Sequence, residues 1–465
     1  MAAPLARFGM VGLGTMGRSL LLNILDHGYP VSGLDTDPEK VRRFNEETAA
    51  KGGRAFTDAK EFVASLQPPR TIMMLVPAGA PVDSVIANLR PLLEKDDFLI
   101  DGGNSFFRDT ERRTAELESS GLGFIGIGVS GGEAGARTGP SMMAGGTAAS
   151  YGHVQQVLEA VAARSPEGRP CVARLGPGGA GHYVKMVHNG IEYGMMQLLA
   201  EAYDLMRRGH GLSMPEAADF FASLDDGEMG GFLVEIAAQV LRVKDDLGDG
   251  WLVDKILDQA KQKGTGKWTS QEAMDLGIPI PTIDAAVSAR QISALRADRL
   301  RAEGLAPRTV STTPFDANAL RNGLKRGFLA CYAQGFSLLR AAATEHNYGF
   351  DLEACASVWR AGCIIRSALI GPLQEALRNG DLPNVLLSPV ITKPGDDDAL
   401  RAVVSAGVQS QVPLPCFSAS LAYVDGLFTG RLPANFIQAQ RDFFGAHTYE
   451  RTDQPGTFHS TWGQA

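Results

Sequence analysis

The segment "RFGMVGLGTMGRSLLLNILDHGYPVSGLD", residues 7–35, holds an apolar run, a glycine-rich turn and a helical pattern in immediate succession. Gly12, Gly14 and Gly17 form a GxGxxG motif between the predicted strand and the predicted helix. The first glycine permits the turn, the second lets a pyrophosphate approach the backbone, and the third lets the helix pack on the strand. The free N–H groups of the helix would face that pyrophosphate. The segment therefore predicts a dinucleotide-binding Rossmann unit, and a tight strand-to-helix turn without a ligand is the alternative.

Asp35 ends the second predicted strand, where this motif expects an acidic residue. A carboxylate at this place accepts hydrogen bonds from the adenosine ribose of NAD and repels the 2′-phosphate of NADP. Thr36 and Asp37 supply no arginine, and Lys40 and Arg42 are the nearest cations. We therefore expect NAD to be preferred. The stretch "DTDPEK" also suits a helix start, and both roles are compatible.

Outward from this segment, the first ~175 residues alternate short apolar runs with helical patterns, which predicts a parallel sheet covered by helices. The glycine-rich stretch "RLGPGGAGH", 174–182, separates this part from an almost wholly helical half. A faint similarity between 191–206 and 330–345 raises the option of a duplicated helical unit. We expect a Rossmann-type α/β domain at 1–178, an all-α substrate and dimerisation domain at 179–435, and a C-terminal tail at 436–465. The helices expected in the second half span 182–209, 215–224, 230–246, 251–262, 281–304, 315–346, 351–379, 397–408 and 415–427.

The segment "GHYVKMVHNGIEYG", 181–194, is an apolar helical pattern interrupted by Lys185, His188, Asn189 and Glu192. At 100° per residue these four lie within an arc of about 100°. A polar stripe in a buried helix is either hydrogen-bonded internally or lines a cavity for a polar ligand. Lysine and glutamate on one face can form an acid–base couple tuned by burial, and a structural ion pair is the alternative.

Three further segments carry side chains suited to ligands. "IDGGNS" (100–105) and "GVSGGEAGARTGPSMMAGG" (128–146) follow predicted strands and offer Asn104 and Ser130. The expected loop "KQKGTGKWTS" (261–270) sets Lys263 beside glycines, which suits a phosphate or a solvated turn. "QAQRDFFGAHTYE" (438–450) holds Arg441 and His447, followed by a tail without helical period.

Composition narrows the classes of function. The net charge of −8 disfavours nucleic-acid binding, and no apolar run is long enough for a membrane span or signal peptide. The five cysteines are scattered and form no CxxC, which favours buried thiols in a reducing compartment and indicates no metal site. We expect a cytoplasmic protein. The cysteines are Cys171, Cys331, Cys355, Cys363 and Cys416.

Together these segments resemble one family, the decarboxylating 6-phosphogluconate dehydrogenases. The resemblance rests on "GLGTMG", "IDGGNS..RDT.RR", "GVSGGE.GAR.GPS", "GHYVKMVHNGIEYG", "QKGTGKWT", "WR.GCIIRS" and "LPANFIQAQRDFFGAHTYE", in order over nearly the whole chain. It implies oxidation and decarboxylation of 6-phospho-D-gluconate to D-ribulose 5-phosphate and CO₂. The resemblance also implies that NAD or NADP accepts the hydride and that the reaction belongs to the pentose phosphate pathway and gluconate utilisation. It further implies an enzyme that works as a homodimer without a metal.

The resemblance also implies a role for each matching residue. Lys185 is the general base and later acid, and Glu192 is the general acid. Arg441 and His447 enter the phosphate site of a second subunit, whose body the tail threads. The remaining substrate residues are Asn104, Ser130, Gly131, Gly132, His188, Asn189, Tyr193, Lys263 and Arg290. The expected cofactor residues are Gly12, Gly14, Thr15, Met16, Gly17, Asp35, Thr36, Val76, Ala78 and Asn104.

Two departures from the family concern the cofactor. The family commonly has Asn-Arg-Thr where this chain has Asp35-Thr36-Asp37, and often a lysine where it has Pro77. Both remove positive charge from the cofactor side, so the family's usual NADP is not assured. Two alternatives to this function remain: a related metal-free β-hydroxyacid dehydrogenase, and a catalytically retired dinucleotide-sensing protein, against which the intact Lys185 and Glu192 argue.

Overall fold

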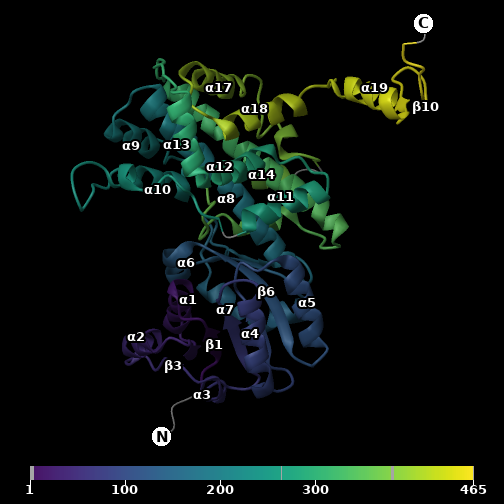
Figure 1. The fold of residues 1–465 in the computed structure, drawn as a ribbon. Coiled ribbons are helices and arrows are strands. Elements are labelled where there is room, and N and C mark those ends of the chain that lie inside the picture. Colours follow the sequence, from purple (N-terminus) through teal and green to yellow (C-terminus); the bar gives the residue numbers. More distant parts are fainter. Residues whose placement is uncertain (1–4, 263, 379–381, 464–465) are drawn as a thin grey trace.

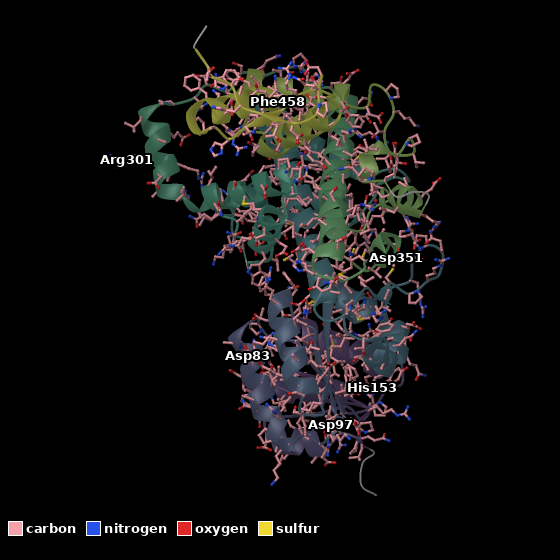
Figure 2. The ribbon with its side chains drawn as sticks, turned by 90° about the vertical axis from the view of Figure 1, so that its right-hand side faces the viewer. Asp83, Asp97, His153, Arg301, Asp351 and Phe458 are labelled. Atoms are coloured by element: carbon pink, nitrogen blue, oxygen red, sulfur yellow. The ribbon has the colours of Figure 1, made fainter. Side chains whose placement is uncertain are left out.

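A computed structural model describes residues 5–262, 264–378 and 382–463. The chain folds into a sheet-containing body and a larger helical body, which meet where α8 begins (Figure 1). Figure 2 shows the same division from a second side, with Asp83, Asp97 and His153 on the first body and Arg301 and Asp351 on the second. The expected fold class, a Rossmann-type domain followed by a large all-α part, is confirmed.

The first body is built on an eight-stranded sheet of order β3-β2-β1-β4-β5-β6-β7-β8. Neighbours are parallel except β6 and β7, which pair antiparallel. Apolar clusters lie on both faces of the sheet, which explains why short strands such as "FGMV" are buried throughout. The strands are β1 (Phe8–Val11), β2 (Val31–Leu34), β3 (Arg54–Phe56), β4 (Thr71–Met74), β5 (Phe98–Asp101), β6 (Gly123–Ser130), β7 (Ser141–Ala144) and β8 (Val172–Arg174).

Helices follow most of these strands, as the alternating pattern predicts. They are α1 (Thr15–Asp26), α2 (Pro38–Thr48), α3 (Ala59–Ala64), α4 (Ala80–Leu89) with a 3₁₀ turn (Arg90–Leu92), α5 (Phe107–Glu118), α6 (Gly132–Thr138) and α7 (Ala148–Val161). Because β1, β4, β5 and β6 run parallel, their carboxyl ends meet at one edge. That edge faces the helical body, so the loops after these strands lie at the junction (Figure 1).

The helical body surrounds α8 (Ala180–Asp204) and α14 (Ala317–Glu345), which pack side by side. Asp316 begins α14 by accepting hydrogen bonds from the N–H groups of Asn318 and Ala319. The other helices are α9 (Met214–Ser223), α10 (Phe232–Val240), α11 (Thr265–Asp275), α12 (Pro281–Ala294), α13 (Arg296–Leu305), α15 (Leu352–Val358), α16 (Ile370–Arg378), α17 (Asp398–Ser410) and α18 (Pro415–Leu427). Short turns cover Leu205–Gly209, Leu252–Lys255 and Val385–Leu387. No helix within the described ranges is long and apolar enough to cross a membrane.

Several expected helix boundaries are wrong. The helix expected over 251–262 is only a 3₁₀ turn at Leu252–Lys255, and residues 256–262 form no helix, although Asp258 pairs there with Arg296 and Arg299. The helix expected over 351–379 breaks between α15 and α16, where Gly362 takes a φ of +68°. The loop expected over 261–270 becomes helical at Thr265, and the glycine-rich segment 128–146, expected to follow a strand, itself contains α6 and β7.

The C-terminal segment folds onto itself. Helix α19 (Ala434–Gly445) and the hairpin of β9 (Tyr449–Glu450) and β10 (Thr457–Phe458) stand apart from the helical body (Figure 1). The Asp442 carboxylate accepts hydrogen bonds from Thr448 N–H at 2.9 Å, Ser460 N–H at 3.1 Å and Trp462 Nε1–H at 2.7 Å. Burial acts to raise the pKa of Asp442, but the hydrogen bond with His459 at 2.9 Å, together with these three, holds it down at about 2. We call this unit, residues 434–462, the C-terminal module.

Candidate active site

Helix α8 brings the predicted polar stripe into the interior. Lys185, His188 and Asn189 are at most 7% exposed, and the Glu192 side chain is 22% exposed. The helix reaches this depth because β6 has a glycine opposite it: a Cβ on Gly128 would lie 2.3 Å from Lys185 Cβ. The stripe therefore lies under the carboxyl end of β6, at the junction of the two bodies.

His188 lies at the centre of the stripe. Its Nδ1 is 3.3 Å from Lys185 Nζ, 3.1 Å from Asn189 Oδ1 and 3.8 Å from Glu192 Oε2. Its Nε2 is 3.1 Å from Ser130 Oγ, which also accepts a hydrogen bond from Ile364 N–H. A proton on Nδ1 satisfies Asn189 Oδ1 and leaves Nε2 to accept from the Ser130 hydroxyl. The structure thus brings together four residues from α8 and one from the end of β6.

Burial shifts the pKa values of the acid and the base in opposite directions. Desolvation lowers the pKa of Lys185, and the charge of Glu192 opposes this. Desolvation raises the pKa of Glu192, and the charges of Lys185 and Arg290 oppose this. The pKa of His188 is well below its usual value because of burial and then Lys185. The stripe can therefore hold a neutral amine, a neutral imidazole and a protonated carboxyl, the forms that proton transfer requires.

A cationic corner lies beyond Glu192. The Arg290 guanidinium, from α12, lies 3.4 Å from the ring centroid of Tyr193, and its Nη1 donates to Lys261 O at 3.5 Å. A Cβ on Gly266 would lie 2.5 Å from the Tyr193 ring, so α11 approaches the ring closely. Tyr193, Arg290 and the turn before α11 therefore share one corner. Lys263, predicted for the same corner, lies outside the described residues.

Two glycine turns adjoin the stripe. Gly131 and Gly132 follow Ser130 with φ values of +125° and +63°, and a Cβ on Gly131 would lie 2.5 Å from Gly362 O. Asn104 is exposed and follows β5 on a second turn. It lines a cavity of about 620 Å³, which we call the junction cavity. The cavity's other lining residues include Met16, Val76, Ala78, Gly79, Gly103, Val129 and Trp268.

The glycine-rich turn after β1 fits a dinucleotide. Gly12 takes a φ of +95°, and a Cβ on Gly17 would lie 1.9 Å from Gly12 O, so neither position accepts a larger residue. A Cβ on Gly14 would meet nothing within 4 Å, which leaves the backbone open at the start of α1. This open cradle, with Thr15 and Met16 beginning α1, suits a pyrophosphate.

Asp35 lies beside a second cavity of about 540 Å³, lined also by Gly12, Thr36 and Val76. The buried carboxylate accepts hydrogen bonds from Leu13 N–H at 2.7 Å and Asp37 N–H at 3.0 Å. Lys40 Nζ lies 3.4 Å from Asp35 Oδ1. Most of the expected cofactor residues therefore line one of these two cavities, Gly14, Thr15 and Gly17 being the exceptions, and Lys40 offsets part of the Asp35 charge.

Arg441 and His447 lie elsewhere. Both are exposed on the C-terminal module, where Arg441 Nη1 donates to Gln438 Oε1 at 2.9 Å. The C-terminal module that carries them stands apart from the helical body that contains α8 (Figure 1). Among the side chains at the junction, sequence reasoning missed Trp268, because its segment reads as a loop. No cluster of His, Cys, Asp and Glu suited to a metal occurs in the described part of the chain.

Known proteins of one family match the whole chain. The model of the NAD binding domain of 6-phosphogluconate dehydrogenase matches residues 7–176, and that of the 6-phosphogluconate dehydrogenase C-terminal domain matches residues 181–462. The decarboxylating 6-phosphogluconate dehydrogenase of Lactococcus lactis is 47% identical over 98% of both chains. The NADP(+)-dependent enzyme of Bacillus subtilis is 46% identical over 98% of this chain and 99% of its own. A Plasmodium falciparum 6-phosphogluconate dehydrogenase structure superposes with a TM-score of 0.91 at 38% identity, covering 98% of this chain and 100% of that one.

Proposed function

The chain belongs to the decarboxylating 6-phosphogluconate dehydrogenase family, and we propose that Lys185 and Glu192 carry out the proton transfers of this reaction. Its activity is the oxidation and decarboxylation of 6-phosphogluconate with reduction of a nicotinamide dinucleotide. The observation that supports these roles is the buried stripe on α8. Burial lowers the pKa of Lys185, so the lysine releases its proton more readily, and raises the pKa of Glu192, so the glutamate keeps its proton more readily.

The proton steps follow from this geometry. Neutral Lys185 takes the proton of the substrate C3 hydroxyl, while the bound dinucleotide supplies the hydride acceptor. Lys185 then returns its proton to the C3 oxygen as the bond to the carboxylate breaks, which releases CO₂ and leaves an enediol. Glu192 protonates the carbon that carried the carboxylate, and Lys185 takes the hydroxyl proton as the ketone forms. Transfer of that proton from Lys185 to Glu192 restores the site.

Other residues of the junction hold the substrate. We propose that Ser130, Gly131, Gly132 and Asn104 bind its carboxylate and hydroxyl end, with His188 and Asn189 beside C3. Tyr193, Arg290 and Lys263 bind its phosphate, because a guanidinium and a glycine-flanked lysine suit that dianion. Two contacts support this arrangement. Lys185 Nζ lies 3.3 Å from His188 Nδ1, and His188 Nε2 lies 3.1 Å from Ser130 Oγ.

The cofactor is a nicotinamide dinucleotide, and we propose that NAD is preferred. Gly12, Gly14, Thr15, Met16 and Gly17 would hold the pyrophosphate. Asp35 and Thr36 would face the adenosine ribose, and Val76, Ala78 and Asn104 the nicotinamide side. The buried Asp35 carboxylate supports the preference, since a 2′-phosphate beside it would be repelled. The Bacillus subtilis relative is named as NADP(+)-dependent, so this chain would differ from it.

We also infer a homodimer with shared sites. The C-terminal module stands apart from its own body and exposes Phe436, Ile437, Phe443 and Phe444, each by more than half. Such a patch is typical of an interface. On this proposal Arg441 and His447 complete the phosphate corner of the partner. The parts 1–178, 179–435 and 436–465 remain our proposed domains, and five buried free thiols support a cytoplasmic location.

The test is the stoichiometry of turnover. Purified protein is given 6-phosphogluconate with NAD or NADP, and reduced dinucleotide, CO₂ and ketose phosphate are measured together. We expect equal amounts of all three. 3-Hydroxyisobutyrate serves as the control for a β-hydroxyacid dehydrogenase, and its oxidation without use of 6-phosphogluconate would contradict the assignment. Dinucleotide binding without turnover of either substrate would instead support a retired enzyme.

A further inference from the structure

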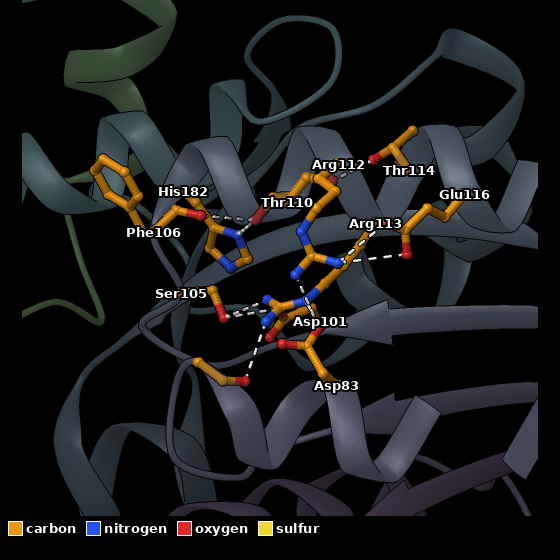
Figure 3. Close-up of polar contacts among 11 residues, drawn as sticks. Asp83, Asp101, Ser105, Phe106, Thr110, Arg112, Arg113, Thr114, Glu116 and His182 are labelled. Carbon is orange, nitrogen blue, oxygen red and sulfur yellow. Dashed lines mark hydrogen bonds and ion pairs between the residues drawn. The ribbon is translucent and has the colours of Figure 1, made fainter. Parts of the chain in front are cut away.

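Arg113 is a buried side chain at the centre of a polar network in the sheet-containing body (Figure 3). The side chain is on α5 and 1% exposed. Nε donates to Asp83 Oδ1 at 2.8 Å, Nη1 to Asp101 Oδ2 at 3.2 Å, and Nη2 to Gly79 O at 3.1 Å. All three nitrogens of the guanidinium are therefore used, each on a different residue.

These partners belong to two separate loops. Gly79 ends the loop after β4 and takes a φ of +83° at the start of α4, whose first turn holds Asp83. Asp101 ends β5, and its carboxylate accepts from Gly103 N–H at 3.1 Å and Ser105 Oγ–H at 2.7 Å. Arg113 thus connects the loop 76–79 to the loop 102–105 through its hydrogen bonds to Gly79 O and to the Asp101 carboxylate.

Both loops form walls of the junction cavity. Val76, Ala78 and Gly79 line it from one side, and Gly103 and Asn104 from the other. Arg113 is not among the lining residues, so it holds the two walls from behind. With the pyrophosphate at the start of α1 and the ribose of the adenosine at Asp35, the junction cavity is the remaining place for the nicotinamide half.

Helix α5 also contacts the catalytic helix. Thr110, one turn before Arg113, is hydrogen-bonded through Oγ1 to His182 Nδ1 at 2.6 Å. His182 precedes Lys185 by one turn of α8, and burial lowers the pKa of its imidazole. The same helix therefore sets the position of the cavity walls and touches the base-bearing helix.

We propose that Arg113 is a positioning residue that fixes the nicotinamide half of the dinucleotide relative to Lys185, by locking the loops 76–79 and 102–105 together. The proposal rests on the proposed function, because it needs a nicotinamide in the junction cavity. A guanidinium is required, since its planar fork reaches three acceptors at once, whereas a lysine ammonium is a point charge on a flexible stem. A lysine at this position preserves the charge opposite Asp101 but not the tie to Gly79.

The test compares Arg113→Lys with Arg112→Ala. Arg112 is the matched control, since it lies on the same helix and also donates to Asp83, at 3.0 Å, whereas Asp101 and Gly79 accept from Arg113. In Arg113→Lys, kcat/KM for the dinucleotide should fall about 10–100-fold, because small misplacements of reacting groups cost rates of this order. Binding of 6-phosphogluconate without cofactor should weaken much less than this, because Asn104 is the one proposed substrate residue on the two loops, and Arg112→Ala should leave both values unchanged.

Two further readouts separate positioning from general damage. Reduced dinucleotide binding, followed without substrate by energy transfer from Trp268 in the cavity wall, should weaken in Arg113→Lys. Amide hydrogen exchange should accelerate at 76–79 and 102–105 and stay unchanged elsewhere. If wild type binds dinucleotide but does not turn over 6-phosphogluconate, the proposed function fails while these two readouts still decide the role of Arg113.

Wild-type kcat/KM in Arg113→Lys would overturn the proposal, and so would an equal loss of substrate and dinucleotide binding. If Arg113→Lys does not fold, the double variant Arg113→Met with Asp101→Asn removes both buried charges together. A folded double variant should then show the same selective loss for the dinucleotide. Wild-type cofactor kinetics in that protein would contradict the proposal that Arg113 holds the two loops together.

Discussion

At the scale of single residues, burial prepares the acid and the base of the site. Lys185 is 5% exposed, lies 3.3 Å from His188 Nδ1 and is close enough to Glu192 for that carboxylate to act on its pKa. Burial lowers the pKa of Lys185 and raises the pKa of Glu192, so both pKa values move towards the pH at which the residues must exchange protons. The two residues lie on one helix face, and His188 contacts both of them.

The first prediction concerns the pH dependence of Glu192→Gln. Lys185 must be deprotonated, so activity rises with pH, and Glu192 must be protonated, so activity falls at higher pH. The wild-type profile is therefore bell-shaped. Glutamine cannot ionise, so the low residual kcat of Glu192→Gln should rise with pH and then stay flat. A fall at alkaline pH as steep as in wild type would show that another group sets that limb.

The second prediction concerns the choice of dinucleotide. The Asp35 charge should favour NAD over NADP by roughly 30–150-fold in kcat/KM, the equivalent of ~2–3 kcal/mol. Asp35→Asn with Thr36→Arg should move the preference towards NADP. Lys40→Ala should deepen the preference for NAD, because Lys40 Nζ lies 3.4 Å from the carboxylate and offsets it.

Initial rates with both dinucleotides, at saturating 6-phosphogluconate, give these ratios. Arg42→Ala is the control, since Arg42 lies on the same helix and forms ion pairs with Glu39 and Glu46. A wild-type protein with the higher kcat/KM for NADP would contradict the role given to Asp35. That result would indicate that a cation such as Lys40 binds the 2′-phosphate of NADP.

At the scale of elements, α8 serves both the site and the core. One face of α8 holds the stripe. Glu201 lies about two turns after Glu192 on the same helix, and its carboxylate accepts hydrogen bonds from Cys416 N–H at 2.9 Å and Phe417 N–H at 3.0 Å. These are free N–H groups at the start of α18, so Glu201 caps that helix from within the core. The arrangement fixes α8 at its far end and keeps the stripe in place.

The third prediction follows from the pKa of Glu201, which burial raises to about 7. Because the folded value lies above the unfolded value of 4.5, the stability from this group is present below pH 4.5 and is lost as pH rises through 7. The difference in unfolding free energy between wild type and Glu201→Gln should therefore fall by about 3 kcal/mol from pH 4.5 to pH 8.

Denaturant unfolding of both proteins across this range measures the difference. Glu216→Gln is the control, since Glu216 also caps a helix but its pKa is lowered by Ser213. Its pH dependence should have the opposite sign. A constant difference between wild type and Glu201→Gln would contradict the raised pKa of Glu201.

Periodicity and glycine spacing predict the strongest elements, such as α1, α8, α14 and the strands that carry the site. They fail where a tertiary contact overrides local preference. Residues 261–270 read as a loop because of their glycines, yet α11 begins at Thr265, since Gly264 takes a φ of +102° and Thr269 bonds to Met186 O on α8 at 2.9 Å. The role of Trp268 was missed for the same reason.

At the scale of the whole molecule, the site lies between two bodies and is completed, on our proposal, by a second chain. The stripe could be predicted from sequence because its four residues are on one helix. The place of Arg441 could not, because nothing local determines where the C-terminal module lies. Within one chain the module keeps its shape through Asp442 but stays away from α8 (Figure 1).

The fourth prediction tests shared sites by mixing two inactive chains. Arg441→Ala loses the residue given to the partner, and Lys185→Met loses the base of its own site. In a heterodimer, the Lys185 of the first chain meets the Arg441 of the second, so one of two sites is intact. Activity should return after subunit exchange. No recovery in heterodimers isolated with two different tags would show that each chain completes its own site.

The most direct measurement of the central claim is the turnover of Lys185→Met with 6-phosphogluconate. Methionine fills the space of the lysine stem but accepts no proton. With Lys60→Met, an exposed lysine of the sheet-containing body, as the control, kcat should fall about 10²–10⁴-fold in Lys185→Met alone. Reduced dinucleotide should bind as in wild type. A Lys185→Met protein that turns over 6-phosphogluconate at near the wild-type rate would contradict the account.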